Sequence, residues 1–455
     1  MSFGQPFNTF LSFARDIGEE GYEYLLRKPL LQLGRHGSKV REMFLGLPAR
    51  QAVTIYAGVL WVIPVAMVQP YVSLYMVALG FSETELGVYQ SMMNLVGLVF
   101  FFIGGYFSDT WGRKKALIFF DILSWGGYCS CLALARNKWW CLAAIFFLAT
   151  NAASGPSYLS LLSEGIASKR RAFVFAVLQM ANQAPFLLFF PLLGGVWVSK
   201  RGLVEANHEM YWLFAVLVAV GIGLRWKLLP DSEAYEKSAL SWFHAFRDGL
   251  RQYRDALGRF FPKPAAGLFL FSKFLDEWII FIWASYSSLY FVHFLGLKDS
   301  FLSIVTQGPA YVAFLSLFLI IPNITEKQII KILGLDQLFG LAALLILLCL
   351  TKGNENVLLI CLISAGLAAV GNALYGSVSA AVWMNIMDEK DRAKVVASSY
   401  AMIKVGIFLT GSAGAFLYGK VSPLSLVWVM IGIRLVGFIL LRRVSRQLSL
   451  AGQVG

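Results

Sequence analysis

Long apolar runs separated by short polar turns fill most of this chain of 455 residues. A run of about 20 apolar residues is long enough to cross a bilayer as a helix. The composition agrees, because 58% of the residues are hydrophobic and only 14% are charged, whereas a soluble protein carries about 25% charged residues. We therefore predict an all-α membrane protein that crosses the bilayer many times.

Twelve spans are predicted, six before and six after a polar stretch that runs from Pro230 to Pro264. The spans lie near residues 52–78, 84–107, 115–135, 138–164, 172–198, 210–229, 264–293, 300–322, 328–350, 356–386, 394–419 and 423–442. The predicted parts are an N-terminal arm over 1–51, a six-helix bundle over 52–229, a central loop over 230–263, a second six-helix bundle over 264–443 and a tail over 444–455.

The two sets of spans repeat each other. Asn151 in the fourth span recurs as Asn372 in the tenth. Asp121 in the third span matches Asp336 in the ninth, at nearly the same separation along the chain. Landmarks that recur at nearly one offset indicate an internal duplication, so we expect two pseudo-symmetric halves.

Positive charge is distributed unequally between the two sides of the predicted membrane. The side that holds residues 104–115 carries 29 Lys and Arg residues, and the opposite side carries seven. Because cytoplasmic loops are enriched in Lys and Arg, we place both termini in the cytoplasm and the protein in the plasma (inner) membrane. The net charge of +13 then reflects topology and indicates no nucleic-acid partner. The expected partners are the lipid bilayer, a small-molecule substrate and, as a further candidate, protons.

Enzymatic chemistry has little support in the sequence. The chain lacks the Gly-x-x-x-x-Gly-Lys-Ser/Thr loop that binds nucleotide phosphates. Its four histidines are scattered, and its five cysteines all fall inside apolar segments, where they are expected to be packing residues. We expect no catalytic site, no metal and no cofactor.

The loop after the second span carries a specific pattern, from Gly104 to Lys115. Gly104 and Gly105 are small and allow close helix packing. Asp109 lies beside a turn at Gly112, and Arg113 begins a cluster of three cations. An ordinary positive loop would explain the cations but not the spacing of the acid and the glycines. The pattern G-x-x-x-D-x-x-G-R-K/R resembles the loop between the second and third helices of the major facilitator superfamily.

This resemblance implies parallel six-helix halves, related by an axis along the membrane normal, that move a solute by alternating access. It also implies a latch on the cytoplasmic side. Asp109 is expected to meet the start of the eleventh helix, at residues 391–396, and Arg113 is expected to meet Glu164 at the end of the fourth helix. Breaking these contacts would open that side.

Charged residues inside the spans are the strongest candidates for a site. Such a residue costs roughly 2.5–3.5 kcal/mol at mid-helix and usually faces a cavity or a partner. In the seventh span Lys273 can pair with Asp276 at i+3 and Glu277 at i+4, which puts all three on one helix face. Lys404 lies at nearly the same depth in the eleventh span.

Two interpretations of these charges stand. In the resembled family the seventh helix lines the central cavity and the eleventh flanks it, so Lys273 or Lys404 would bind an anionic group while Asp276 or Glu277 exchanges a proton. Alternatively, Lys273 and Glu277 form a pair that only stabilises the helix surface. Asn151 and Asn372 lie on helices that line the cavity in the family, and either bind substrate or bond to another helix.

Four further charges are predicted to be structural. Asp336 and Arg434 lie at similar depths in the ninth and twelfth spans, and an Asp336–Arg434 ion pair is expected. Asp121 is expected to pair likewise with Arg225 in the sixth span. These spans are peripheral in the resembled family, which favours a role in stability over a role in transport.

The leading interpretation is a secondary transporter, proton-coupled in one version, for an organic anion or a small polar solute. Lys273 and Lys404 favour the anion. A drug, amphiphile or lipid exporter is the alternative, favoured by aromatic-rich spans. Asn151 stands where proton-coupled drug exporters of the family carry an arginine, which weakens that alternative. A sensor or scaffold that transports nothing is a third interpretation, from another functional class.

Overall fold

The computed structural model describes residues 47–165, 168–231, 247, 251, 254, 255, 258, 260–262, 265–319, 329–350, 356–386 and 392–450. The N-terminal arm and most of the central loop lie outside these ranges, as do that of Asp109 and many other side chains near the ends of helices, within residues 168–179, 317–319, 329–333, 376–386, 392–397 and 448–450. Every regular element in the described ranges is a helix.

The first six predicted spans are each formed by one helix or by consecutive helical segments. In chain order these are α4 (Ala49–Val68), η3 (Gln69–Tyr71) and α5 (Val72–Ala78); α6 (Glu83–Thr110); α7 (Arg113–Asp121), η4 (Ile122–Gly126) and α8 (Gly127–Ala133); α9 (Lys138–Ala149), η5 (Thr150–Ala153) and α10 (Ser154–Ser163); α11 (Ser168–Leu187) and α12 (Phe190–Arg201); and α13 (Leu203–Leu228).

The second six spans follow the same plan. They are α15 (Ala266–Leu289) with η6 (Tyr290–Phe294); η7 (Asp299–Phe301) with α16 (Leu302–Leu319); α17 (Ile329–Leu348); α18 (Val357–Ile386); α19 (Arg392–Phe416) with η10 (Leu417–Val421); and α20 (Pro423–Leu450). The sixth and twelfth helices are longer than predicted, because polar residues such as Glu205 and Arg446 occupy helical turns beyond the apolar run.

Most of these stretches are suited to lipid. By length and composition, seven described stretches can cross a membrane, and α11 with α12, which are bent by 40°, would make an eighth. α15 differs from these stretches because three charged residues, Lys273, Asp276 and Glu277, lie near its middle. Charges at that depth need partners, and those partners define the candidate site.

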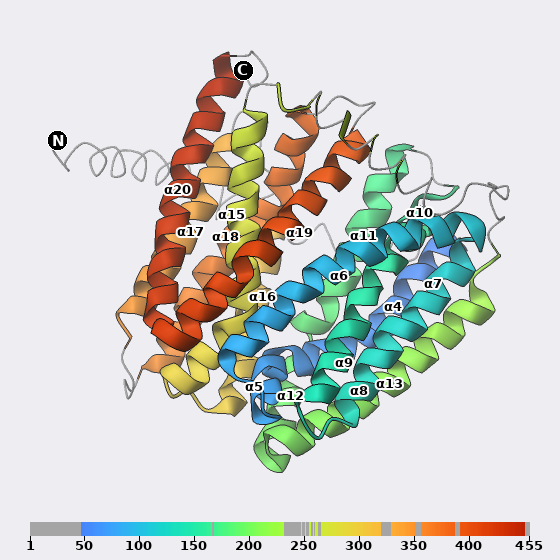
Figure 1. Ribbon diagram of the computed structural model, residues 1–455, viewed down its shortest axis with the longest axis horizontal. Helices are drawn as coiled ribbons and strands as arrows, with labels where there is room; N and C mark the ends of the chain where they lie inside the picture. The colour runs from blue at the N-terminus through green and yellow to red at the C-terminus, as the bar shows by residue number, and fades with distance from the viewer. Residues whose placement is uncertain are drawn as a thin grey trace.

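The helices form two groups that meet along α6 and α19. Figure 1 shows α15 to α20 on one side of the molecule and α4 and α7 to α13 on the other, with α6 crossing beside α19. α12 also packs against α16, and α5 against α15. The exact residues at which the two halves begin and end stay a prediction.

Several contacts join the two groups at the end of the molecule opposite the 104–115 loop. The Ser73 hydroxyl donates to the Ser285 carbonyl at 2.8 Å, and the Tyr286 hydroxyl donates to the Glu83 carbonyl at 2.8 Å. His293 Nδ1 lies 3.3 Å from Glu83 Oε1. These contacts hold the start of α6 against the end of α15, so the two halves are joined at this end.

Candidate functional site

A buried cluster of charges lies between α15, α17 and α20. It consists of Asp276, Asp336, Gln337 and Arg434, and we call it the Arg434 cluster. Arg434 Nη1 lies 3.0 Å from Asp276 Oδ1 and 2.9 Å from Asp336 Oδ2. Gln337 Nε2 donates to the same two oxygens, at 2.7 Å and 3.2 Å. None of the four residues is more than 4% exposed.

Three glycines let the helices close around the Arg434 cluster. A Cβ at Gly340 of α17 would lie 2.7 Å from Arg434 Nε, and one at Gly371 of α18 would lie 2.7 Å from Asp336 Oδ1. A Cβ at Gly437 of α20 would lie 3.0 Å from Gln337 Oε1. Because a real Cβ rarely approaches so closely, each glycine leaves space that a charged or amide group fills.

The partners of Lys273 differ from the prediction. Lys273 Nζ lies 3.6 Å from Glu277 Oε1 and 5.7 Å from the centre of the Tyr375 ring, but Asp276 is held by Arg434 instead. The side chains of Lys273 and Glu277 are 24% and 34% exposed, whereas that of Asp276 is 2% exposed. The prediction that Lys273 pairs with both acids is therefore wrong. Asp276 and Glu277 are adjacent in the chain, so their side chains leave the helix about 100° apart, and only Glu277 lies on the partly exposed side.

Lys404 has neutral partners. Its Nζ donates to Asn94 Oδ1 of α6 at 2.9 Å and lies 5.2 Å from the centre of the Tyr400 ring. Among the described residues it makes no ion pair. This contact crosses the seam between α6 and α19, and sequence reasoning missed Asn94, whose only signal was an amide in an apolar span.

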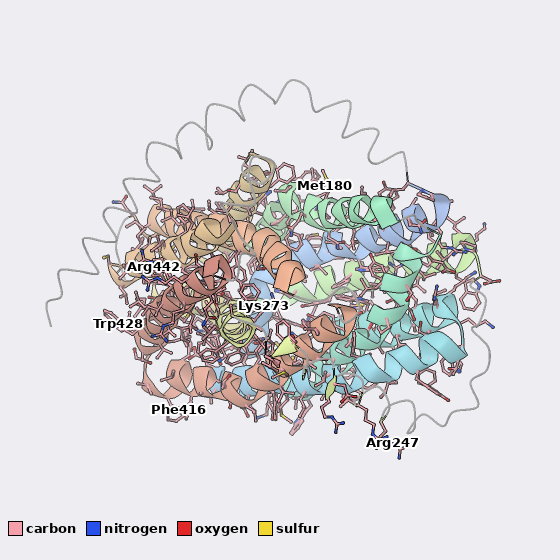
Figure 2. All side chains as sticks on the ribbon, turned by 90° about the horizontal axis from the view of Figure 1, so that it is seen from above. Met180, Arg247, Lys273, Phe416, Trp428 and Arg442 are labelled. Carbon is pink, nitrogen blue, oxygen red and sulfur yellow. The ribbon has the colours of Figure 1, made fainter. Side chains whose placement is uncertain are left out.

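Lys273 and Lys404 lie on neighbouring helices. A Cβ at Gly406 of α19 would lie 2.6 Å from Phe274 Cε2 of α15, so the two helices are in close contact beside both lysines. In Figure 2, Lys273 lies toward the middle of the molecule, whereas Phe416 and Trp428 lie at its rim. The two lysines therefore lie on packed neighbouring helices of the second half, and Lys404 meets α6 of the first half.

The two predicted asparagines have different surroundings. Asn151 lies in η5, where the Ser154 hydroxyl donates to its carbonyl at 2.9 Å and to its Oδ1 at 3.1 Å. Asn372 is exposed on α18. Asn151 is thus partly satisfied within its own span, and a role for either amide in binding stays a prediction.

The first half contains a simpler buried pair. Arg225 Nη1 of α13 lies 2.5 Å from Asp121 Oδ2 of α7, and both residues are at most 2% exposed. Arg225 Nη2 also donates to the Thr54 carbonyl at 2.8 Å. The Arg225 guanidinium lies 4.3 Å from the centre of the Trp61 ring and 5.4 Å from that of Tyr158. One acid thus balances one base here.

The 104–115 loop makes the predicted turn. Gly112 has a φ of 85° and precedes α7, a conformation that a side chain would strain. Of the two glycines predicted to allow close packing, Gly104 does so, because a Cβ there would lie 2.5 Å from Ala153 Cα, whereas a Cβ at Gly105 would meet open space. The side chain of Asp109 and residue 391 lie outside the described part, so their contact stays a prediction.

Glu164 forms ion pairs with two basic residues near this loop. Its Oε2 lies 3.0 Å from Arg113 Nη1 and 3.1 Å from Arg50 Nη1, and its carbonyl accepts from Gln51 Nε2 at 2.9 Å. The start of α4 therefore shares in the predicted latch, which sequence reasoning missed because Arg50 belongs to no recognisable motif.

A second ion pair lies on the same side of the molecule. Lys114 Nζ lies 2.9 Å from Asp231 Oδ1, whose side chain is 88% exposed. The hydrogen bond from Lys114 lowers the pKa of the Asp231 carboxyl, and the positive charge of the same lysine adds to this effect. The ion pair connects the 104–115 loop to the segment that follows α13.

The sequence profile of the Major Facilitator Superfamily matches residues 54–336. The chain belongs to the major facilitator superfamily. It is a multi-pass integral membrane protein, and transporters of this family are secondary transporters.

Two curated relatives align with part of the chain. YqjV of Bacillus subtilis, an uncharacterized MFS-type transporter, is 29% identical over 181 residues, which make up 37% of this chain and 41% of YqjV. YajR of Escherichia coli, an inner membrane transport protein, is 26% identical over 170 residues, which make up 37% of this chain and 36% of YajR. The chain thus aligns with less than half of each relative.

Solved structures share the fold at low sequence identity. A crystal structure of the nucleoside transporter NupG has a TM-score of 0.64 and 13% identity, covering 88% of this chain and 99% of that one. The peptide transporter POT in complex with sulfate has a TM-score of 0.65 and 13% identity, covering 88% and 95%. The predicted fold class, two pseudo-symmetric six-helix bundles, is confirmed.

Proposed function

We propose that this transporter carries a small anionic or polar solute and is driven by protons. The observation that carries the proposal is Lys404, an intramembrane cation whose described partners are an amide and an aromatic ring. A cation at mid-membrane costs roughly 2.5–3.5 kcal/mol. Because Asn94 and Tyr400 bring no negative charge, an anionic group on the solute would complete the site.

The Lys273–Glu277 pair is the second part of the proposed solute site. At 3.6 Å and with both side chains partly exposed, it resembles a surface ion pair, and such pairs contribute about 1 kcal/mol or less. A solute anion can therefore displace Glu277 from Lys273 at low cost. Together Lys273, Glu277 and Lys404 carry one net positive charge, which suits a monoanion.

The contacts between the halves support a state that is closed at one end. Ser73, Tyr286 and His293 join the halves at the end opposite the 104–115 loop. We propose that this end faces outward, that both termini lie in the cytoplasm of a plasma (inner) membrane, and that the bundles are residues 52–229 and 264–443. In that orientation the Glu164 contacts, which lie within the first half, are on the cytoplasmic side, where Asp109 would meet the start of the eleventh helix when that side closes.

Transport by purified protein in proteoliposomes tests the proposal. A mixed library of labelled organic anions and amphiphilic cations would be offered with and without a pH gradient. We expect movement of anions that depends on the gradient, and a loss of at least about tenfold in Lys404→Gln, equivalent to about 1.4 kcal/mol.

Lys420 provides the matched control, because it lies in η10 at the end of the same helical stretch and is exposed. Lys420→Gln should transport as the unchanged protein does. Movement of amphiphilic cations in place of anions would support the exporter alternative. Full anion transport by Lys404→Gln would contradict the role given to this lysine.

A further inference from the structure

The Arg434 cluster contains two buried carboxylates but one buried cation. We propose that it binds one proton, shared between Asp276 and Asp336, and that this proton is the coupling ion of the proposed transport cycle. Only the coupling role rests on the proposed function. The presence of the bound proton can be tested without any solute.

The charges around the cluster do not balance it. Arg434 of α20 offsets one of the two acids, and Gln337 of α17 is neutral. Tyr375 of α18 lies near Asp276, is uncharged at neutral pH, and its hydroxyl makes no hydrogen bond in the described part of the chain. A second charge in a low-dielectric interior would cost several kcal/mol after relaxation, and binding a proton removes that cost.

Charges on the neighbouring helices are engaged elsewhere. On α15 itself, Lys273 lies against Glu277 and the Tyr375 ring. On α19, Lys404 donates to Asn94. Neither lysine forms an ion pair with Asp276 among the described residues, so the cluster carries one net negative charge unless a proton occupies it.

The unused oxygens give the proton a place to bind. Each carboxylate turns one oxygen toward Arg434, and its other oxygen, Asp276 Oδ2 or Asp336 Oδ1, is buried without a hydrogen-bond partner in the described part of the chain. Buried polar atoms are nearly always satisfied. Protonation of either oxygen makes that acid neutral, leaving a one-to-one ion pair between Arg434 and the other acid.

Comparison of the two halves shows which of the two acids has no counterpart in the first half. Asp336 follows Asp121 by 215 residues and Arg434 follows Arg225 by 209 residues, so each lies in the corresponding span of the other half. Asp276 follows Trp61 at the same offset as Asp336 follows Asp121, and the Trp61 ring packs on Arg225 at 4.3 Å. The first half therefore holds its helices together with one acid, one base and an aromatic ring. The second acid is not needed for packing of this kind, which points to a role in transport.

The position of Asp276 connects the proton to the solute. Asp276 precedes Glu277 in α15, and Glu277 holds Lys273 on the partly exposed face of the same helix turn. Loss of the proton leaves the cluster with its net negative charge. A movement of α15 that relieves this charge would also move the Lys273–Glu277 pair, so one helix serves both sites.

Infrared difference spectroscopy on the full-length protein in lipid nanodiscs tests the proton directly. A protonated carboxylic acid has a C=O stretching band that moves to lower frequency in D2O. We expect one such band from the unchanged protein as the pH is lowered, and its loss in both Asp276→Asn and Asp336→Asn. Each of these variants keeps one acid for Arg434, as in the first half, so each should fold.

Asp121→Asn and Glu277→Gln are the controls, and both should keep the band. Persistence of the band in both Asp276→Asn and Asp336→Asn would overturn the proposal, as would its loss in Glu277→Gln or in Asp121→Asn protein that has folded. Sodium chloride added at constant pH should leave the band unchanged. If sodium removes it, the site binds a sodium ion and the proton assignment is wrong. A band that behaves as expected, with no anion transport in proteoliposomes, would contradict the proposed function alone.

Discussion

Each half of the molecule has a buried arginine that is paired with acid, but the partners of the two arginines differ. In the first half Arg225 has one acid, Asp121, and its guanidinium packs under Trp61. In the second half Arg434 has Asp336 at the repeat-related position and Asp276 where the first half has the tryptophan. In net charge, the two sites therefore differ by one acid, Asp276. The first half has a balanced pair and the second half has one negative charge in excess, so variants of the first half serve as controls for the second.

The largest expected effect comes from removing the two arginines. Breaking a buried ion pair costs about 3–5 kcal/mol, so Arg225→Gln and Arg434→Gln should both lower the thermal unfolding temperature in detergent. At alkaline pH, Arg434→Gln should have the larger fall in unfolding temperature, because it leaves two acids without a counter-charge. Acid pH should partly restore its unfolding temperature by neutralising these acids. Equal and pH-independent losses in the two variants would argue against the charge difference between the halves.

Removal of an acid should destabilise the protein more in the first half than in the second. Asp121→Asn leaves Arg225 without a counter-charge and should cost about 3–5 kcal/mol. Asp276→Asn leaves the Asp336–Arg434 pair intact, so its unfolding temperature should stay close to that of the unchanged protein. Thermal unfolding of the two variants side by side is the measurement. A loss in Asp276→Asn as large as in Asp121→Asn would mean that Asp276 is a structural acid.

A smaller effect is expected at the surface near the 104–115 loop. Glu164→Gln removes the acid shared by Arg50 and Arg113, and should slow transport if the latch closes that side. Its effect on stability should be about 1 kcal/mol or less, as for other exposed pairs. Unchanged transport in Glu164→Gln would remove Glu164 from the latch.

The smallest effect is expected for Asp231→Asn, the matched control on the same side. Lys114 lowers the pKa of Asp231 in the folded state, so this acid stabilises the fold above its ordinary pKa of about 3.9. That contribution is lost as the pH falls through the lowered value. Unfolding temperatures of the variant and the unchanged protein should thus differ slightly at neutral pH and converge in acid. A gap that widens in acid would contradict this sign.

Much of this arrangement could be predicted from the sequence. Apolar runs gave the helices, the 104–115 pattern gave the turn at Gly112, and similar depths in repeat-related spans placed Asp121 near Arg225 and Asp336 near Arg434. The structure brings both pairs together. Such inferences succeed because helix geometry fixes depth along the membrane normal.

The partners across helices could not be predicted in the same way. The spacing of Lys273, Asp276 and Glu277 fixes their helix face within about a turn, but not which neighbour each will meet. Asp276 reaches Arg434 because three glycines on other helices leave room for the cluster. The alignment of Asp276 with Trp61 at the offset of the repeat was the one available signal.

The most direct test of the central claim compares accumulation with exchange in proteoliposomes, using an organic anion identified by the library assay. Asp276→Asn should still exchange labelled for unlabelled anion across the membrane, because Lys404 and the Lys273–Glu277 pair remain. It should no longer accumulate the anion when a pH gradient is applied, whereas Asp121→Asn protein that has folded should do so. Accumulation by Asp276→Asn equal to that of the unchanged protein would contradict the account.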